Sequence, residues 1–241
     1  MSGSSTPVQN AQLESIDQEI FAHESALRDL RSRRNLLIPI SKLPVEVLCT
    51  IFMFCVRERA YRWHWLTITH ICRLFRIAAL NCPALWATPE FAKPNLASEM
   101  IERSKMSLLT VEADIATPHI LDVVSAGLKE AARLKKIHIS TSRLHYMDRI
   151  ICELDRPAPF LDSLYLNNSF FEPYLLPSDF LADDAPRLSH IELYNCNLRW
   201  DSSLFRNLVH LKNHNPVPPA PTLDQFIDVL AGMPQLEVLD L

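Results

Sequence analysis

Glycine is nearly missing from this sequence, because the 241 residues contain only Gly3, Gly127 and Gly232. Loops that cradle phosphate groups need the backbone conformations and the close approach that glycine allows. Three isolated glycines therefore exclude a Rossmann or P-loop nucleotide site. The 17 prolines are instead expected to mark the ends of helices and strands.

Cysteine pairs and long apolar runs are also missing. The six cysteines form no C-x-x-C pair, and their spacing resembles neither a zinc site nor a disulfide framework. The polar N-terminus lacks the apolar core of a signal peptide, and no run of about eighteen apolar residues predicts a membrane span. We therefore expect free thiols, no membrane partner, and a cytoplasmic or nuclear location.

Positive charge is not in surplus. The 24 Lys and Arg residues face 28 Asp and Glu residues, for a net charge of −4. The basic cluster at residues 31–34 is explained better by a solvated helix face than by a nuclear signal. Nucleic acid is accordingly not an expected partner. A helix-turn-helix DNA reader is the least favoured alternative, since the second predicted helix of such a unit offers only Arg73 and Arg76.

Signatures of catalysis are missing as well. The sequence has no G-x-S-x-G, no H-E-x-x-H and no calcium-binding loop. His70 and Cys72 are close in sequence, but two positions apart on a predicted helix their side chains point to different sides. The sequence therefore predicts a protein that is not an enzyme and that needs no cofactor or metal.

The N-terminal part of the chain predicts one helix. Residues 1–12 are small and polar and are expected to be disordered, whereas residues 13–38 carry apolar groups at alternating spacings of three and four. Two interpretations stay open: a coiled coil that forms a homodimer, or an amphipathic helix that lies on the next domain. The predicted seam consists of Leu13, Ile16, Ile20, His23, Leu27, Leu30, Arg34 and Leu37.

Residues 39–90 predict a small helical domain with more apolar surface than its interior needs. Pro44 suits the first turn of a helix, and a wide apolar stripe follows it. A charged and aromatic segment, residues 57–65, breaks the pattern before a second helix from about Leu66 to Leu80, and Pro83 prevents that helix from continuing. One helix buries only one stripe, so the surplus apolar surface indicates a protein partner.

Beyond a predicted connecting helix at residues 91–106, the chain repeats itself. Four segments that start at Leu108, Leu134, Leu161 and Leu188 carry apolar residues at their first, fourth and sixth positions, at intervals of 26, 27 and 27 residues. This L-x-x-L-x-L pattern predicts a degenerate leucine-rich-repeat-like α/β solenoid over residues 107–241. The alternative is a mixed α/β domain whose strands happen to be evenly spaced. The chain stops at Leu241 within a looser copy, so the array is expected to be incomplete or its last strand covered.

The helical domain resembles the F-box family. The resemblance rests on "LPVEVLCTIFMFC" and on "THICRLFRIAALNCPALW", in which Phe75 replaces the usual tryptophan. It implies docking to the Skp-type adaptor of cullin–RING ubiquitin ligases, with contact or support from Leu43, Pro44, Val47, Leu48, Ile51 and Phe52. It also implies a domain core of Ile68, Ile71, Phe75 and Trp86.

A leucine-rich array behind an F-box is a familiar pairing in that family. The expected fold class is therefore α+α/β: an N-terminal amphipathic or coiled-coil helix, a small helical F-box, and the repeat region. The resemblance implies a non-catalytic substrate receptor that holds an unknown protein substrate on the repeats. An interaction scaffold that binds the adaptor without delivering substrates is the alternative.

Overall fold

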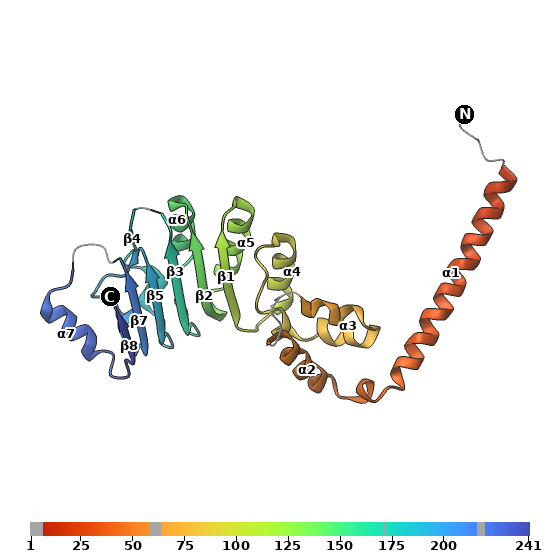
Figure 1. Ribbon diagram of the computed structural model, residues 1–241, viewed down its shortest axis with the longest axis horizontal. Coiled ribbons are helices and arrows are strands. Elements are labelled where there is room, and N and C mark those ends of the chain that lie inside the picture. Colours follow the sequence, from red (N-terminus) through yellow and green to blue (C-terminus); the bar gives the residue numbers. More distant parts are fainter. Residues whose placement is uncertain (1–6, 58–63, 171, 216–219) are drawn as a thin grey trace. The chain divides into compact units, whose positions relative to one another are not determined.

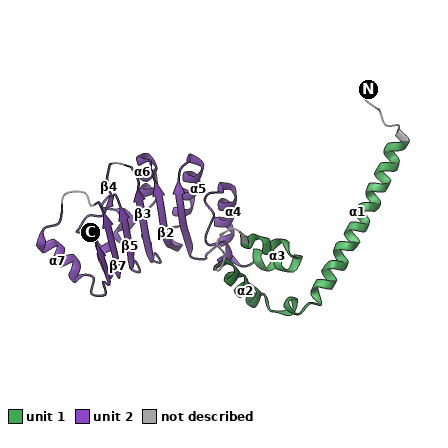
Figure 2. Ribbon diagram, viewed as in Figure 1, with its two compact units in different colours: residues 1–81 green, residues 82–241 purple. Residues whose placement is uncertain are grey.

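The computed structural model describes residues 7–57, 64–170, 172–215 and 220–241. The chain divides into two compact units, residues 1–81 and 82–241 (Figure 2). It mixes helices with a parallel sheet of six strands (Figure 1), as the sequence predicts at this level. The first unit contains α1 (Pro7–Leu36), the 3-10 helix η1 (Pro39–Lys42), α2 (Val45–Arg57), the 3-10 helix η2 (His64–His70) and α3 (Arg73–Leu80).

The first helix is longer than predicted. It begins at Pro7, so the expectation of disorder over residues 7–12 is wrong, while residues 1–6 lie outside the described residues. It ends at Leu36, just before Pro39, where the sequence predicts a stop. Proline at the first position of a helix loses no needed hydrogen bond, which explains why Pro7 and Pro39 each open an element.

The second predicted helix of this unit is divided in two. The segment from Leu66 to Leu80 forms the 3-10 helix η2 and then α3, with a turn at Ile71 between them. Cys72 is the N-cap of α3, and its sulfur accepts a hydrogen bond from the amide of Phe75 at 3.5 Å. This cap starts a new helix where periodicity alone predicts one continuous helix. The predicted break over residues 57–65 lies largely outside the described residues.

Unit 2 contains the sheet and most of the buried apolar residues. Its helices are η3 (Pro83–Trp86), α4 (Pro94–Ser104), α5 (Pro118–Leu128), η4 (Ala131–Arg133), α6 (Leu144–Cys152), η5 (Phe180–Asp183), η6 (Ser203–Phe205) and α7 (Leu223–Ala231). Its strands are β1 (Leu109–Ile115), β2 (Leu134–Thr141), β3 (Ser163–Asn168), β4 (Tyr174–Leu175), β5 (His190–Tyr194), β6 (Cys196–Asn197), β7 (His210–His214) and β8 (Val238–Asp240).

The strands follow chain order across the large sheet, β1-β2-β3-β5-β7-β8, and each adjacent pair is parallel. The residues that the sequence pattern places at the fourth position of each segment lie directly opposite one another. They form one row across the sheet: Val111, Ile137, Leu164, Ile191, Leu211 and Leu239. The regular spacing of these residues along the sequence therefore places them side by side across the sheet.

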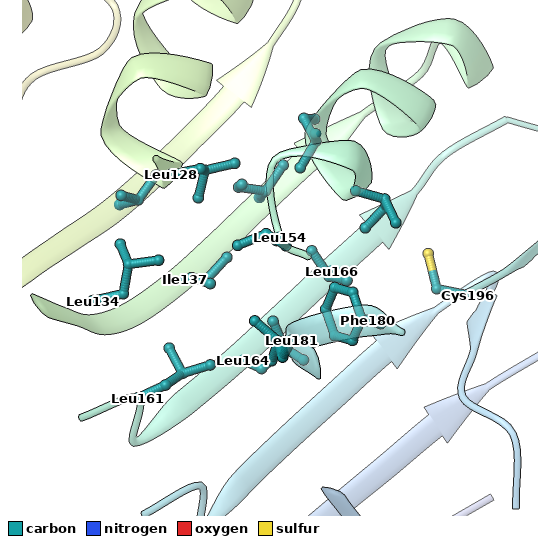
Figure 3. Packing of buried hydrophobic residues seen from close by; sticks show 14 of the residues in the cluster. Leu128, Leu134, Ile137, Leu154, Leu161, Leu164, Leu166, Phe180, Leu181 and Cys196 are labelled. Carbon is teal, nitrogen blue, oxygen red and sulfur yellow. The ribbon is translucent and has the colours of Figure 1, made fainter. Parts of the chain in front are cut away.

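One face of the sheet is buried. Helix α5 packs on β1 and α6 packs on β2, and side chains alternate between buried and accessible along β3 and β5. Figure 3 shows the inward residues of β2 and β3 meeting Leu128 of α5, Leu154, and Phe180 and Leu181 of η5. Alternation of this kind puts leucine and isoleucine in the core and leaves the opposite face polar.

Buried polar side chains follow the apolar residues at the ends of β2 and β3. Thr141 donates a hydrogen bond through Oγ1 to the carbonyl of Ile115 in the preceding strand, at 3.2 Å. Asn168 donates through Nδ2 to the carbonyls of Glu172 at 2.7 Å and of Asn195 at 3.5 Å. These hydrogen bonds tie the ends of β2 and β3 to neighbouring backbone, and the carbonyl of Asn195 also accepts the amide of Tyr174 at 2.8 Å.

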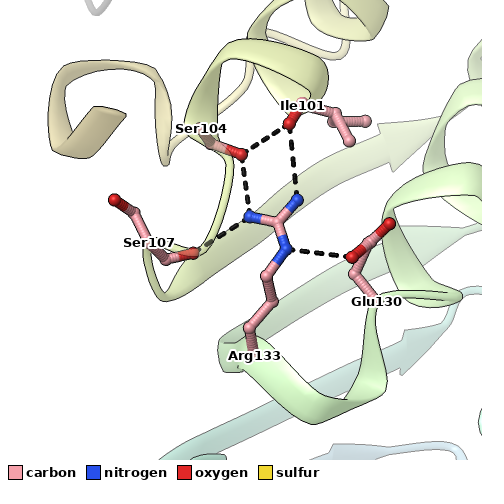
Figure 4. A network of polar contacts seen from close by, with 5 residues as sticks. All are labelled: Ile101, Ser104, Ser107, Glu130 and Arg133. Atoms are coloured by element: carbon pink, nitrogen blue, oxygen red, sulfur yellow. Dashed lines mark hydrogen bonds and ion pairs between the residues drawn. The ribbon is translucent and has the colours of Figure 1, made fainter. Parts of the chain in front are cut away.

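The guanidinium of Arg133 joins α4 to the start of β2. It is buried and donates to Ser104 Oγ at 2.8 Å, to the carbonyl of Ser107 at 2.9 Å and to that of Ile101 at 3.3 Å. Its Nε also lies 3.0 Å from a carboxylate oxygen of Glu130 (Figure 4). The planar guanidinium of arginine carries five N–H donors and can bond several fixed acceptors at once, whereas the ammonium group of lysine does not offer this geometry.

Asparagine occupies three of the seven left-handed backbone positions found among the described residues. Asn195, Asn207 and Asn215 have φ of 53°, 60° and 58°. Asparagine tolerates this left-handed region better than other residues that carry a Cβ. These asparagines therefore take backbone positions that a more ordinary sequence would give to glycine.

The boundary between the units differs from the predicted end of the helical domain at residue 90. The division falls after Asn81, so η3 belongs to unit 2. There the amide of Thr110 donates to the carbonyl of Ala87 at 2.8 Å, and the guanidinium carbon of Arg103 lies 4.6 Å from the ring centroid of Trp86. Residues 82–90 thus have contacts of their own within the second unit.

Candidate functional site: an apolar helix face and an open sheet face

Helix α2 presents an apolar side that the described chain leaves uncovered. Leu43 precedes the helix and has the extended backbone that a residue before proline prefers. The carbonyl of Pro44 accepts hydrogen bonds from the amides of Val47 and Leu48, both at 3.1 Å. Leu43 is 37% exposed, Val47 42% and Phe54 58%. We define the outer α2 face as Leu43, Pro44, Val47, Ile51 and Phe54, of which Pro44 is exposed and Ile51 half-buried.

The six residues predicted to contact or support the adaptor divide between two sides of the helix. Leu43, Pro44, Val47 and Ile51 belong to the outer α2 face, whereas Leu48 and Phe52 are 1% and 2% exposed. Of the two roles that the resemblance implies, contact or support, burial leaves these two residues the supporting one. Residues four apart in an α-helix share a side, and this pair lies roughly 100° or more away from Val47. The sequence missed Phe54, although its place seven residues after Val47 could have revealed it.

The predicted core set also divides. Ile68 and Phe75 are buried, and Trp86 is buried as well but lies in unit 2. Ile71 is 63% exposed, so its assignment to the core is wrong. The physical reason is the turn between η2 and α3, in which the amide of Ile71 donates to the carbonyl of Ile68 and its side chain leaves the inner side of α3.

A second apolar surface of unit 1 lies where α1 ends. Leu36 there faces Leu74 and Ile77 of α3 across a hollow of about 220 Å³. Ser32, Asn35, Ser41, Cys72 and Arg73 complete its lining. Ile77 is 48% exposed, so this hollow adds accessible apolar surface to the same helical unit.

The open face of the sheet in unit 2 carries stacked rings. His138 and Tyr165, neighbours on β2 and β3, stack with centroids 3.8 Å apart and planes 6° apart. Tyr194 continues the ladder at 5.5 Å from Tyr165 and 4.4 Å from His214. Charged residues share the central row of this face, which runs Glu112, His138, Tyr165, Glu192, Lys212 and Asp240.

These rings are held in place by polar partners. The hydroxyl of Tyr194 donates to Oε1 of Glu192 at 2.7 Å, and this hydrogen bond raises the pKa of Tyr194 to about 12. Beside it, His214 Nε2 lies 3.7 Å from a carboxylate oxygen of Asp240, an ion pair when the imidazole is protonated. Rigid aromatic groups with polar ends are typical of surfaces that bind polypeptides.

A hollow of unit 2 lies beside β6 and has a volume of about 510 Å³. Its charged groups already pair with each other, because Nη2 of Arg199 lies 2.6 Å from Oδ2 of Asp201. This hydrogen bond lowers the pKa of Asp201, and the same carboxylate raises the pKa of Arg199. The ring of Trp200 and the side chain of Leu175 belong to the same lining.

Metal clusters and membrane-spanning helices are not found in the described part of the chain. Residues 7–57, 64–170, 172–215 and 220–241 contain no group of three His, Cys, Asp or Glu residues placed to hold a metal ion. Among the same residues, no helix combines the length and the apolar character that crossing a membrane requires. None of the six cysteines is joined in a disulfide. No family model, curated protein or solved structure matches the chain.

Proposed function

We propose that the chain is a non-catalytic substrate receptor of a cullin–RING ubiquitin ligase, with an F-box formed by α2, η2 and α3 and a leucine-rich-repeat region in unit 2. The observation that carries the proposal is the outer α2 face. Three of its side chains, Leu43, Val47 and Phe54, are apolar and more than a third exposed. Two of them, Leu43 and Val47, stand at positions where the F-box pattern implies adaptor contact.

The energy available at this face supports a protein partner. Burying one large aliphatic or aromatic side chain contributes about 1.5–3 kcal/mol, and a standard interface buries about 1,600 Å² in total. The outer α2 face supplies an apolar centre of the kind that such an interface needs, and the hollow beside Ile77 adds to the apolar area. The inner side of α2, with Leu48 and Phe52, holds the face in position.

Substrate binding is proposed for the open face of the sheet. The chain order of its parallel strands and the in-register leucine row support a repeat array, which presents such a face to its ligands. The ladder of His138, Tyr165, Tyr194 and His214 offers rigid apolar rings beside Glu192. A polypeptide segment with aromatic or cationic side chains fits this chemistry best.

The proposed binding to the adaptor is tested with the full chain and a purified Skp-type adaptor. We expect Leu43→Asp and Val47→Asp each to reduce adaptor co-purification at least tenfold, because a charge enters the apolar centre of the interface. Val238→Asp is the matched control, since Val238 is also apolar and 38% exposed but lies on β8. Undiminished binding by both α2 variants, with unchanged thermal unfolding, would refute the docking mode.

A second measurement separates a receptor from a scaffold. Proteins that co-purify with the wild-type chain are identified, and their half-lives are compared in cells with wild-type chain and in cells with Val47→Asp. A receptor predicts longer half-lives for bound proteins when the adaptor contact is lost. Unchanged half-lives despite lost adaptor binding would favour the scaffold that binds the adaptor without delivering substrates.

A further inference from the structure

Helix α1 is long, and within unit 1 only its C-terminal end, from Ser32 onward, lies beside other elements. Its 30 residues span about 45 Å at 1.5 Å per residue. The side chains from Gln9 to Arg31 are all exposed, including Phe21 at 68%. Helices in proteins gain most of their stability from packing of an apolar side, so a helix of this length that is exposed from Gln9 to Arg31 indicates a missing partner.

The uncovered side chains form a seam. We define the α1 seam as Leu13, Ile16, Ile20, Leu27 and Leu30, which are 57%, 53%, 51%, 47% and 59% exposed. Their places within the alternating spacings of three and four put them on the side of the helix that a coiled coil buries. Within unit 1 these five side chains do not pack on the helical domain that follows.

Charge is distributed unevenly along the same helix. Residues 7–24 contain Glu14, Asp17, Glu19 and Glu24 and no Lys or Arg, whereas residues 25–36 contain four Arg and one Asp. The two halves thus carry formal charges of opposite sign. We propose that α1 pairs with α1 of a second copy of this chain in an antiparallel coiled coil, so that the acidic half of each helix lies beside the basic half of the other.

The heptad positions specify a register for this pairing. With Leu13 and Ile20 at a positions and Ile16 and Leu30 at d positions, an antiparallel dimer sets Ile20 of one copy against Leu30 of the other. The two polar positions that interrupt the seam then meet apolar partners. His23 of one copy lies opposite Leu27 of the other, and Arg34 lies opposite Ile16.

The flanking positions agree with the same register. Asp17 of one copy faces Arg31 of the other, and Glu19 faces Arg33, so the two-fold symmetry produces four attractive pairs. The single like-charge meeting is Glu24 with Glu24 at the centre. There Oε2 of each Glu24 lies 3.9 Å from Nη2 of Arg28 in its own helix, which offsets the repulsion.

A parallel dimer in register is disfavoured by the same residues. It would stack His23 on His23 and Arg34 on Arg34 within the seam, and it would put Glu19 of one copy beside Glu24 of the other. None of its flanking pairs joins opposite charges. Like charges at such positions destabilise a pair of helices, so orientation follows from charge as well as from the seam.

The antiparallel and the parallel dimer should respond in opposite ways to the same pair of charge reversals. In the antiparallel dimer, Asp17→Lys with Glu19→Lys sets lysines against Arg31 and Arg33, and we expect the dimer dissociation constant to rise roughly tenfold or more. Adding Arg31→Glu and Arg33→Glu to the same chain should restore the dimer. In a parallel dimer the first variant would instead bind more tightly, since the lysine introduced by Glu19→Lys would meet Glu24.

The measurement is sedimentation equilibrium of the full chain and the variants at low and high salt, with circular dichroism at 222 nm to check that α1 stays helical. Expected results are a dimer for wild type, weakening by Asp17→Lys with Glu19→Lys, and recovery in the fourfold variant. A wild-type chain that is monomeric at every concentration, or a dimer strengthened by the first variant, would overturn the proposal.

Thiol cross-linking gives an independent answer on orientation. Ile20→Cys and Leu30→Cys variants are prepared separately, mixed and oxidised mildly, with wild-type chain as the control for the native cysteines. The antiparallel register expects a disulfide that joins an Ile20→Cys chain to a Leu30→Cys chain, and little product from Ile20→Cys alone. Cross-linking of Ile20→Cys to itself would contradict it. Because the α1 seam shares no residue with the outer α2 face, neither result depends on adaptor binding.

Discussion

The ring of Phe52 on α2 meets the ring of Phe75 on α3 edge-on, with centroids 5.2 Å apart and planes 61° apart. Phe52 is 2% exposed and Phe75 9%. An aromatic pair of this geometry contributes about 0.5–1.5 kcal/mol beyond the area it buries. The contact joins the two α-helices of the small helical unit and so determines which side of α2 remains for a partner.

Replacing Phe52 with alanine should unfold this unit, whereas changing the outer side of α2 should not. We expect Phe52→Ala to lower the stability of α2 and α3 by about 3–5 kcal/mol, because a large buried ring is removed. Val47→Ala should cost about 0.5 kcal/mol or less. Hydrogen exchange of peptides from 45–57 and 73–80 measures both effects. Equal protection in the two variants would contradict this division of α2 into an inner and an outer side.

Loss of the Arg133 guanidinium should destabilise unit 2. Arg133→Ala removes donors from Ser104, Ser107 and Ile101 in a buried setting, at an expected cost of about 2–4 kcal/mol in the free energy of unfolding. The matched control is Arg149→Ala. Its exposed ion pair with Asp122, at 2.8 Å, contributes about 1 kcal/mol or less. Urea denaturation of both variants would show whether burial makes this difference.

Two buried asparagines should respond oppositely to leucine. Asn213 stands in register with Leu193, and its Oδ1 is buried without a hydrogen-bond partner. Asn213→Leu should therefore raise the free energy of unfolding by about 1–2 kcal/mol. Asn168→Leu should lower it by about 1–3 kcal/mol, because the carbonyls of Glu172 and Asn195 lose a donor. Changes of the same sign in both variants would contradict this account.

The carboxylate of Asp183 should make stability depend on acid pH. Burial raises its pKa, but hydrogen bonds from the Ser202 hydroxyl at 2.6 Å and the Ser203 amide at 2.9 Å outweigh burial, so the pKa is lowered overall. A lowered folded-state pKa means that the stabilisation is present above the unfolded value of about 3.9 and is lost as pH falls through the folded value.

Asp183→Asn should therefore flatten the pH dependence of unfolding in that acid range and cost about 0.5–2 kcal/mol at neutral pH, as loss of a helix cap does. The exposed neighbour Asp184 provides the control variant, Asp184→Asn. Thermal unfolding scans from pH 7 downward measure both. A wild-type slope retained in Asp183→Asn would assign the acid sensitivity to other groups.

Local sequence patterns predicted much of this protein's architecture. The interval between leucine segments predicted strands at Leu134, Leu161 and Leu188, and β2, β3 and β5 lie there. The small parallel pair β4 and β6 was missed, because two-residue strands leave no periodicity to detect. The turn at Ile71 was missed too, since its apolar side chain fits a continuous helix as well as it fits the side of a turn.

What the sequence alone determined is the order of the main helices and strands, the scarcity of glycine loops and the positions of the apolar rows, because these follow from residue type and from helical and strand periods. Which apolar residues are covered was decided only in three dimensions. Leu48 and Val47 are neighbours of similar character, yet one is 1% and the other 42% exposed. Burial depends on what packs against each side of a helix, and adjacent residues point about 100° apart.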